Sequence, residues 1–130
     1  MLECLCLALA LFAHPLWGEG AREGEEPHIR LLVQSSPLAG SQFHALAHLH
    51  ASMRVGDALT LVREPENPYD AKAIRVEWRG SQLGYVPRRE NRAVAAALDQ
   101  GKKLHARISR LNPEAADPWQ RLEFEVWLEL

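Results

Sequence analysis

Residues 61–76 read Leu-Val-Arg-Glu-Pro-Glu-Asn-Pro-Tyr-Asp-Ala-Lys-Ala-Ile-Arg-Val, and this stretch decides how the rest of the chain is interpreted. Its first part continues an alternating segment that starts at Leu59, and its last part opens the strict alternation of residues 74–78. Both patterns predict half-buried strands. Pro65 and Pro68 exclude regular structure between them, because proline has no N–H donor and restricts the residue before it. The stretch therefore predicts two strands joined by a stiff loop.

The sequence after this stretch predicts a hairpin and then a helix. Arg79 and Gly80 form a turn signal that leads into a strand at residues 82–86, which Pro87 ends. Residues 89–100 carry apolar side chains at helical spacing, and a glycine follows them, as is typical after a helix.

Three more strands are predicted, at residues 28–34, 104–111 and 122–129. A turn is expected at residues 35–40, while residues 41–54 fit either a strand or a short helix. About six short strands with one or two helices indicate a mainly β chain, folded as a small antiparallel barrel that is closed or nearly closed.

Length and charge place modest limits on function. The 130 residues suit a single domain, and a formal net charge of -2 gives no overall attraction to nucleic acid or membrane. The charge is uneven, however. Residues 63–110 hold eleven Lys or Arg against six Asp or Glu, between acidic flanks at residues 19–26 and 111–130. This basic block is either a local anion site or an ordinary solvated surface.

The N-terminal sequence predicts an export leader. Residues 4–13 are apolar and uncharged, too short to span a bilayer as a helix but suited to the core of a secretory signal. We expect a signal peptide at residues 1–20, an acidic linker at 21–27 and a domain at 28–130. Both cysteines lie in the apolar run, so the mature chain would have none. The protein is expected in the periplasm, or in the cytoplasm if the leader does not function.

No catalytic motif is present in the sequence, whether a phosphate-binding loop, a metalloprotease helix or a nucleophile elbow. His44, His48 and His50 are grouped, but no carboxylate stands near them to complete a metal site, so we predict no metal and no cofactor. Glu64 and Asp70 have neither a nucleophile nor a metal ligand beside them. The sequence favours a binding protein over an enzyme, and a monomer without a membrane span in the mature chain.

The opening stretch resembles the HIRAN family, whose signature is Arg-Glu-Pro-x-Asn-Pro-Tyr-Asp-x-x-Ala-Ile/Val-x-Val. The resemblance continues through Gly80 and the Gly-Tyr-Val-Pro-Arg element of residues 84–88, and it covers about residues 30–128. It implies an OB-like barrel that binds single-stranded DNA at a free 3′ end. In this family the module is often fused to helicase-like DNA translocases, whose ATPase and RING parts have no counterpart in this sequence.

The resemblance also implies a binding site. Asp70 matches the acid that accepts a hydrogen bond from the terminal 3′-hydroxyl, and Tyr69 matches an aromatic that stacks on a terminal base. Strong DNA binders of the family carry Arg-Tyr-Tyr upstream, where this chain has Gln-Phe-His, so the stacking face is kept and the arginine is lost. Arg88 matches a cation near the phosphates, and Arg89 adds a second arginine at the basic start of the predicted helix. The full set of candidate site residues is Phe43, Asn67, Tyr69, Asp70, Tyr85, Arg88 and Arg89.

Physical reasoning supports this set but leaves alternatives open. An acid in a phosphate site suits a 3′-hydroxyl, which donates to it, and disfavours an internal phosphodiester, which does not. Asn67 and Asp70 equally suit turn residues that bond the backbone, and Tyr69 and Tyr85 suit core positions. Two functions remain: a binder of single-stranded nucleic-acid 3′ ends, or an exported envelope module that kept the fold with a different ligand.

Overall fold

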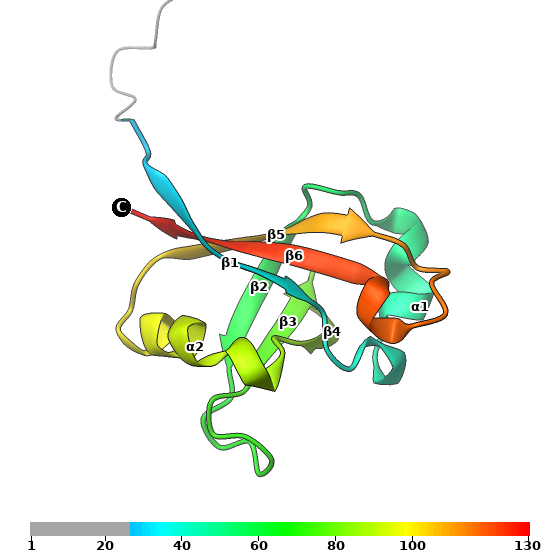
Figure 1. The fold of residues 1–130 in the computed structure, drawn as a ribbon, viewed down its shortest axis with the longest axis horizontal. Coiled ribbons are helices and arrows are strands. Elements are labelled where there is room, and N and C mark those ends of the chain that lie inside the picture. The colour runs from blue at the N-terminus through cyan, green and yellow to red at the C-terminus, as the bar shows by residue number, and fades with distance from the viewer. Residues whose placement is uncertain (1–26) are drawn as a thin grey trace, which may run out of the picture.

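The computed structural model describes residues 27–130, which form one antiparallel sheet of six strands with two short α-helices (Figure 1). The predicted signal peptide and nearly all of the acidic linker lie outside the described residues. The elements are β1 (Arg30–Pro37), α1 (Leu46–Leu49), β2 (Ala58–Arg63), β3 (Ile74–Trp78), β4 (Ser81–Tyr85), α2 (Arg92–Asp99), β5 (Leu104–Leu111) and β6 (Leu122–Glu129). Short 3₁₀ segments add Ser41–Phe43, His50–Ser52, Arg88–Glu90 and Pro118–Gln120.

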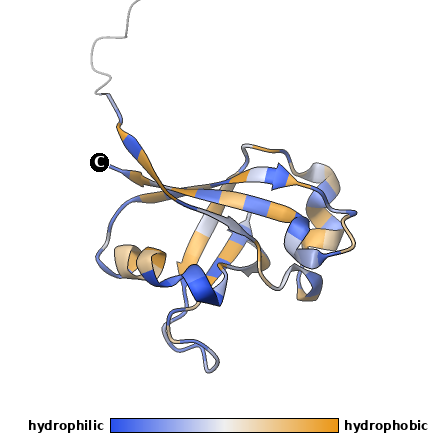
Figure 2. Ribbon diagram, in the orientation of Figure 1, coloured by the Kyte–Doolittle hydropathy of each residue, from blue (hydrophilic) through white to orange (hydrophobic). Residues whose placement is uncertain are grey.

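The strands alternate as their sequences require. Ile74, Val76 and Trp78 of β3 are buried, while Arg75 and Glu77 between them are partly exposed. The same alternation of hydrophobic and hydrophilic residues runs along β6 (Figure 2), where Leu122, Phe124 and Val126 are inaccessible to water. Alternation of this kind buries one face of the sheet and removes its apolar area from water. In the described part of the chain, no helix is long and apolar enough to cross a membrane.

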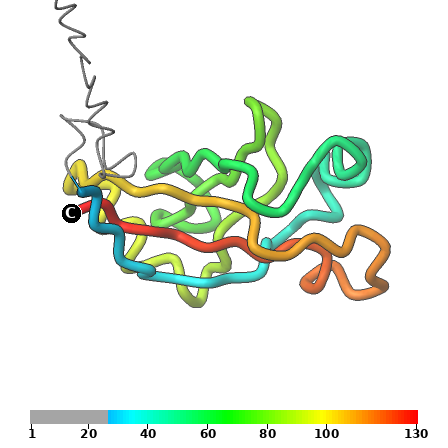
Figure 3. The backbone as a smooth tube through the Cα atoms, turned by 90° about the horizontal axis from the view of Figure 1, so that it is seen from above, coloured from blue at the N-terminus to red at the C-terminus, as the bar shows by residue number. Residues whose placement is uncertain are grey.

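The sheet order is β1-β6-β5-β2-β3-β4, so β1 and β4 are the outer strands. β1 lies beside β6, which brings the first and last strands together (Figure 3). Just after β1, Ala39 forms a single antiparallel bridge with Tyr85 of β4, through two backbone hydrogen bonds of 2.9 Å each. The described residues contain no β1–β4 ladder, so the expected barrel is confirmed only as a six-stranded, mainly β sheet with two short helices.

Three predicted boundaries were wrong or undecided. Residues 35–37 continue β1 instead of turning, because β6 pairs with Ser35, Ser36 and Pro37 and buries Ser36. The segment 41–54 contains short helical turns and no strand. The helix begins at Arg92 rather than residue 89, because a separate 3₁₀ turn occupies Arg88–Glu90.

Candidate functional site

The loop between β2 and β3 is built around Asn67. Its side-chain oxygen accepts hydrogen bonds from the backbone N–H groups of Tyr69, at 2.9 Å, and Asp70, at 3.2 Å. Bonds of this pattern define an Asx turn, and Pro68 inside it fixes a further backbone angle. The loop extends beyond the sheet near α2 (Figure 1). Its closed conformation presents Tyr69 with 85% of its surface exposed.

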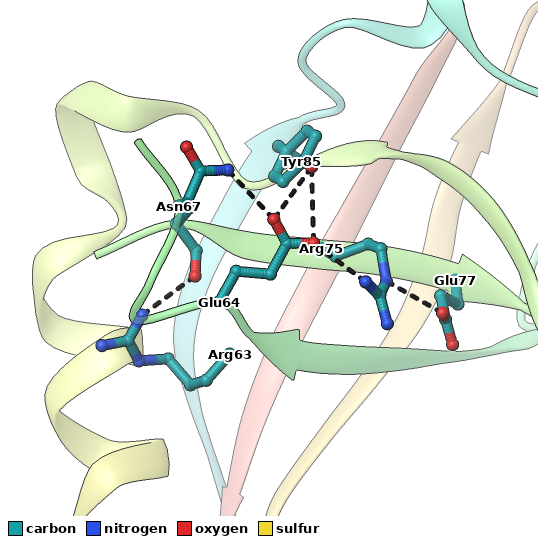
Figure 4. A network of polar contacts seen from close by, with 7 residues as sticks. Arg63, Glu64, Asn67, Arg75, Glu77 and Tyr85 are labelled. Carbon is teal, nitrogen blue, oxygen red and sulfur yellow. Dashed lines mark hydrogen bonds and ion pairs between the residues drawn. The ribbon is translucent and has the colours of Figure 1, made fainter. Parts of the chain in front are cut away.

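Glu64, at the start of this loop, joins three segments of the fold (Figure 4). Its carboxylate accepts hydrogen bonds from the Asn67 amide at 3.0 Å and from the Tyr85 hydroxyl at 3.0 Å. Arg75 of β3 donates to its other oxygen at 2.9 Å and also to Glu77 at 2.9 Å. The loop is therefore tied to β3 and β4 by one partly buried carboxylate.

The charges in this network are mutually stabilised. Burial alone would raise the pKa of Glu64, but the hydrogen bonds from Asn67, Tyr85 and Arg75 outweigh it and lower the pKa below its ordinary value. Burial raises the pKa of Tyr85, and the neighbouring Glu64 carboxylate raises it further. At neutral pH the tyrosine therefore stays a hydrogen-bond donor and the glutamate stays an acceptor.

Arg63, the last residue of β2, holds the far side of the loop. Its guanidinium donates to the backbone carbonyls of Ala73, at 2.9 Å, and Ala71, at 3.1 Å. It also pairs with the carboxylate of Asp99 at the end of α2, with one bond of 2.9 Å and one of 3.2 Å. One planar cation thus fastens both the loop and the helix to β2.

Asp70 has both carboxylate oxygens engaged. The backbone N–H of Lys72 donates to one at 2.9 Å, and the side-chain amide of Asn91 donates to the other at 2.7 Å. Burial would raise the pKa of Asp70, but these two bonds and the charges of Arg88 and Arg63 lower it below its ordinary value. Asp70 is therefore ionised at neutral pH, with acceptor sites left over, because a carboxylate offers about four.

A cavity of about 420 Å³ lies beside the loop of Asn67 and Asp70. Five of the seven residues expected from the sequence line it: Asn67, Tyr69, Asp70, Tyr85 and Arg88. Ala39, Pro68, Ala73 and Val86 complete its mostly apolar wall. The other two predicted residues lie elsewhere. Phe43 is 79% exposed on a 3₁₀ turn and does not line the cavity.

Arg89 borders a neighbouring cavity of about 650 Å³, which shares Arg88 with the first. Pro37, Pro87, Glu90 and Trp119 form the rest of its lining. Trp119 is half exposed, and its backbone is fixed by the Asp117 carboxylate, which accepts from its N–H at 3.0 Å. Trp119 was not among the site residues expected from the sequence. An aromatic in a polar loop was the available signal, but only the fold brings that loop to Arg88.

The three grouped histidines lie on the segment before β2. Among residues 27–130 there is no group of three His, Cys, Asp or Glu side chains that could hold a metal ion. His44 instead packs its ring against Tyr85, with 5.9 Å between the ring centroids.

Solved structures with the same fold include two chains of different origin. A protein from Lactobacillus plantarum matches with a TM-score of 0.69 at 28% sequence identity, covering 79% of this chain and 98% of that one. The HIRAN domain of human HLTF matches with a TM-score of 0.55 at 18% identity, covering 77% of each chain. The second likeness is one of fold alone.

A curated relative matches through the sequence. The Fanconi-associated nuclease 1 homolog of Oryza sativa subsp. japonica is 32% identical over 73 residues, or 53% of this chain. The chain spans only 7% of the length of that protein, so the match concerns one small part of it. The HIRAN domain family matches residues 31–130, which include all of the sheet except its first residue, the loop of Asn67 and Asp70, and both cavities. On this evidence the chain belongs to the HIRAN domain family.

Proposed function

We propose that this HIRAN domain binds the 3′ end of a single DNA strand, with the terminal nucleotide in the cavity between Tyr69 and Tyr85. The observation that carries the proposal is the ionised Asp70 carboxylate in the same cavity as an exposed tyrosine and Arg88. A site for ordinary phosphodiester backbone would exclude a carboxylate. A free 3′-hydroxyl is a donor that makes the carboxylate favourable.

The neighbouring side chains suit the rest of the strand. Tyr69 offers a solvent-facing ring, and stacking of a base on an aromatic ring contributes about 1–3 kcal/mol without regard to sequence. Arg88 stands between the two cavities and is suited to the phosphate that follows the terminal nucleoside. Trp119 gives the second cavity an aromatic wall for the next base. The family resemblance supports the same ligand.

Fluorescence anisotropy with three short oligonucleotides tests the proposal: one ends in a 3′-hydroxyl, one ends in a 3′-phosphate and one is a closed circle. A shielded hydrogen bond from a hydroxyl to a carboxylate contributes about 1.5–3 kcal/mol, so we expect at least about tenfold preference for the 3′-hydroxyl. The strand that ends in a 3′-phosphate should bind more weakly than the 3′-hydroxyl strand, because its phosphate meets the Asp70 carboxylate with like charge.

Asp70→Asn should narrow the gap between the 3′-hydroxyl and 3′-phosphate strands. Glu66→Gln is the matched control, because Glu66 is an exposed acid of the same loop. It should leave the preference unchanged. Equal binding of all three oligonucleotides would reduce Asp70 to a turn residue. If no strand binds at micromolar protein, the envelope-module alternative that the apolar N-terminal run suggests replaces this proposal.

A further inference from the structure

Asn91 is a polar residue that the proposed site does not yet explain. It precedes α2, where asparagine usually accepts a hydrogen bond from a backbone N–H of the first helical turn. Here its backbone has right-handed helical angles, φ -84 and ψ -12, and its side chain makes no such cap. Only 2% of the residue is exposed. A buried amide that does not cap its helix requires another partner.

That partner is Asp70. The Asn91 amide nitrogen donates to one Asp70 oxygen at 2.7 Å, across 21 positions of sequence. The Lys72 N–H holds the other oxygen at 2.9 Å. The carboxylate thus accepts one hydrogen bond from the residue that precedes α2 and one from its own loop. Its plane is fixed before any ligand arrives, which lowers the conformational entropy lost on binding.

We propose that Asn91 is the positioning residue of the 3′-end site: its amide orients the Asp70 carboxylate so that the remaining acceptor positions face the cavity. This inference rests on the proposed function of Asp70. A residue that can only donate at this point suits the task, because an acceptor there would compete with the ligand or repel the carboxylate. Asparagine supplies the donor without a charge that would weaken the attraction between Asp70 and the hydroxyl.

Asn91→Asp tests the donor directly, because it keeps the shape and removes the N–H. Two carboxyl groups in contact share a proton, and the pair titrates at a higher pH than either acid alone. Arg88 and Arg63, the cations that act on Asp70, are present in both proteins and oppose this rise. The 3′-hydroxyl strand should therefore bind the variant nearly as well as the wild type at pH 5, where the shared proton supplies a donor. By pH 8 the variant should be at least about tenfold weaker.

Each result is taken as the ratio of variant to wild type at the same pH, which cancels the titration of other groups. Gln100→Glu is the matched control, because it adds the same charge at an exposed position just after α2. It should show a flat ratio. A flat ratio for Asn91→Asp, with the wild-type preference for the 3′-hydroxyl intact, would overturn the positioning role while the proposed function stands. A wild type without that preference would overturn the proposed function itself.

Asn91→Ser keeps the experiment informative if the aspartate variant does not fold. Serine is smaller than asparagine and keeps a polar group at this position, so the fold should be retained, but its side chain is too short to reach Asp70. We expect the preference for the 3′-hydroxyl over the 3′-phosphate to shrink several-fold, with a melting temperature near that of the wild type. An undiminished preference in a folded Asn91→Ser protein would also overturn the proposal.

Discussion

At the scale of single residues, Glu64 shows how a side chain outside the cavity determines its shape. The Asn67 amide and the Tyr85 hydroxyl both donate to it, and these two residues stand in the cavity wall on the loop and on β4. Arg75 balances its charge from β3. The conformation of the loop and the position of the tyrosine ring are therefore coupled through one carboxylate.

Glu64→Gln should destabilise the fold by about 1–3 kcal/mol at pH 7, because the new amide group must face one of the three donors. The folded-state pKa of Glu64 is below its ordinary value of 4.5, so its contribution is fully present above that value and is lost as the pH falls through the lower, folded pKa. Urea unfolding of both proteins between pH 7 and pH 3 should show the difference shrink at the acid end. A constant difference across this range would contradict the assignment. Glu66→Gln serves as the control.

Gly84 is required by a close approach and not by a special backbone angle. A methyl group at this position would overlap the carbonyl oxygen of Ala39, and it would crowd Leu38 as well. Gly84→Ala should therefore cost about 1–3 kcal/mol of unfolding free energy, as overpacking usually does. Urea unfolding measures it, with Ser81→Ala of the same strand as a control that should change little. Wild-type stability in Gly84→Ala would mean that the Ala39–Tyr85 bridge yields easily.

At the scale of elements, the site depends on joints between the loop, the helix and β2. Arg63 connects all three, because its guanidinium donates to two loop carbonyls and to the Asp99 carboxylate at once. The pKa of Asp99 is lowered by the hydrogen bond from Arg63, which keeps the pair ionised.

Arg63→Lys should destabilise the protein by about 1–2 kcal/mol, because an ammonium group lacks the planar fork that reaches all three partners. Thermal unfolding gives the loss, and amide hydrogen exchange should quicken in the loop of residues 64–73. Arg92→Lys, an exposed position of α2, provides the comparison and should behave as the wild type. Unchanged exchange in the loop of the Arg63→Lys protein would show that the prolines alone hold it.

Local patterns allowed most elements to be predicted from the sequence. The alternation of residues 74–78 and the prolines of the loop depend on neighbours in sequence, so both were found. The strand at Ser35–Pro37 was missed because its hydrogen-bond partners are in β6. The contact of Asn91 with Asp70 and the approach of Trp119 to Arg88 were missed for the same reason: the tertiary fold creates them.

At the scale of the whole molecule, the overall charge does not favour general attraction to DNA. The formal net charge is -2, and several basic side chains of β5 are paired with acids of β6, such as Arg107 with Glu125. Arg88 and Arg89 border the cavities instead. Two cations of the chain thus stand at the candidate site.

Replacing Arg88 and Arg89 with alanine should weaken DNA binding and reduce the slope of log K against log salt by about one to two units, because fewer counterions are released. Anisotropy titrations from low to moderate salt measure the slope. The pair Arg107→Ala and Arg110→Ala should leave it unchanged, since both arginines already face glutamates of β6. An unchanged slope after the loss of Arg88 and Arg89 would show that neither arginine contacts phosphate.

The pairing of β1 with β6 also affects how the protein is made. Arg30 stands opposite Glu129, so the strand that leaves the ribosome first finds its partner only when synthesis has reached the far end of the domain. At a synthesis rate of about 5–20 residues per second, β1 waits roughly 5–20 s. Even after pairing, about half of the surface remains exposed at Leu31, Leu32 and Val33. The nascent chain therefore exposes an apolar segment until β6 has been made. The sheet is completed only after translation of the domain, and until then β1 lacks the strand with which it pairs.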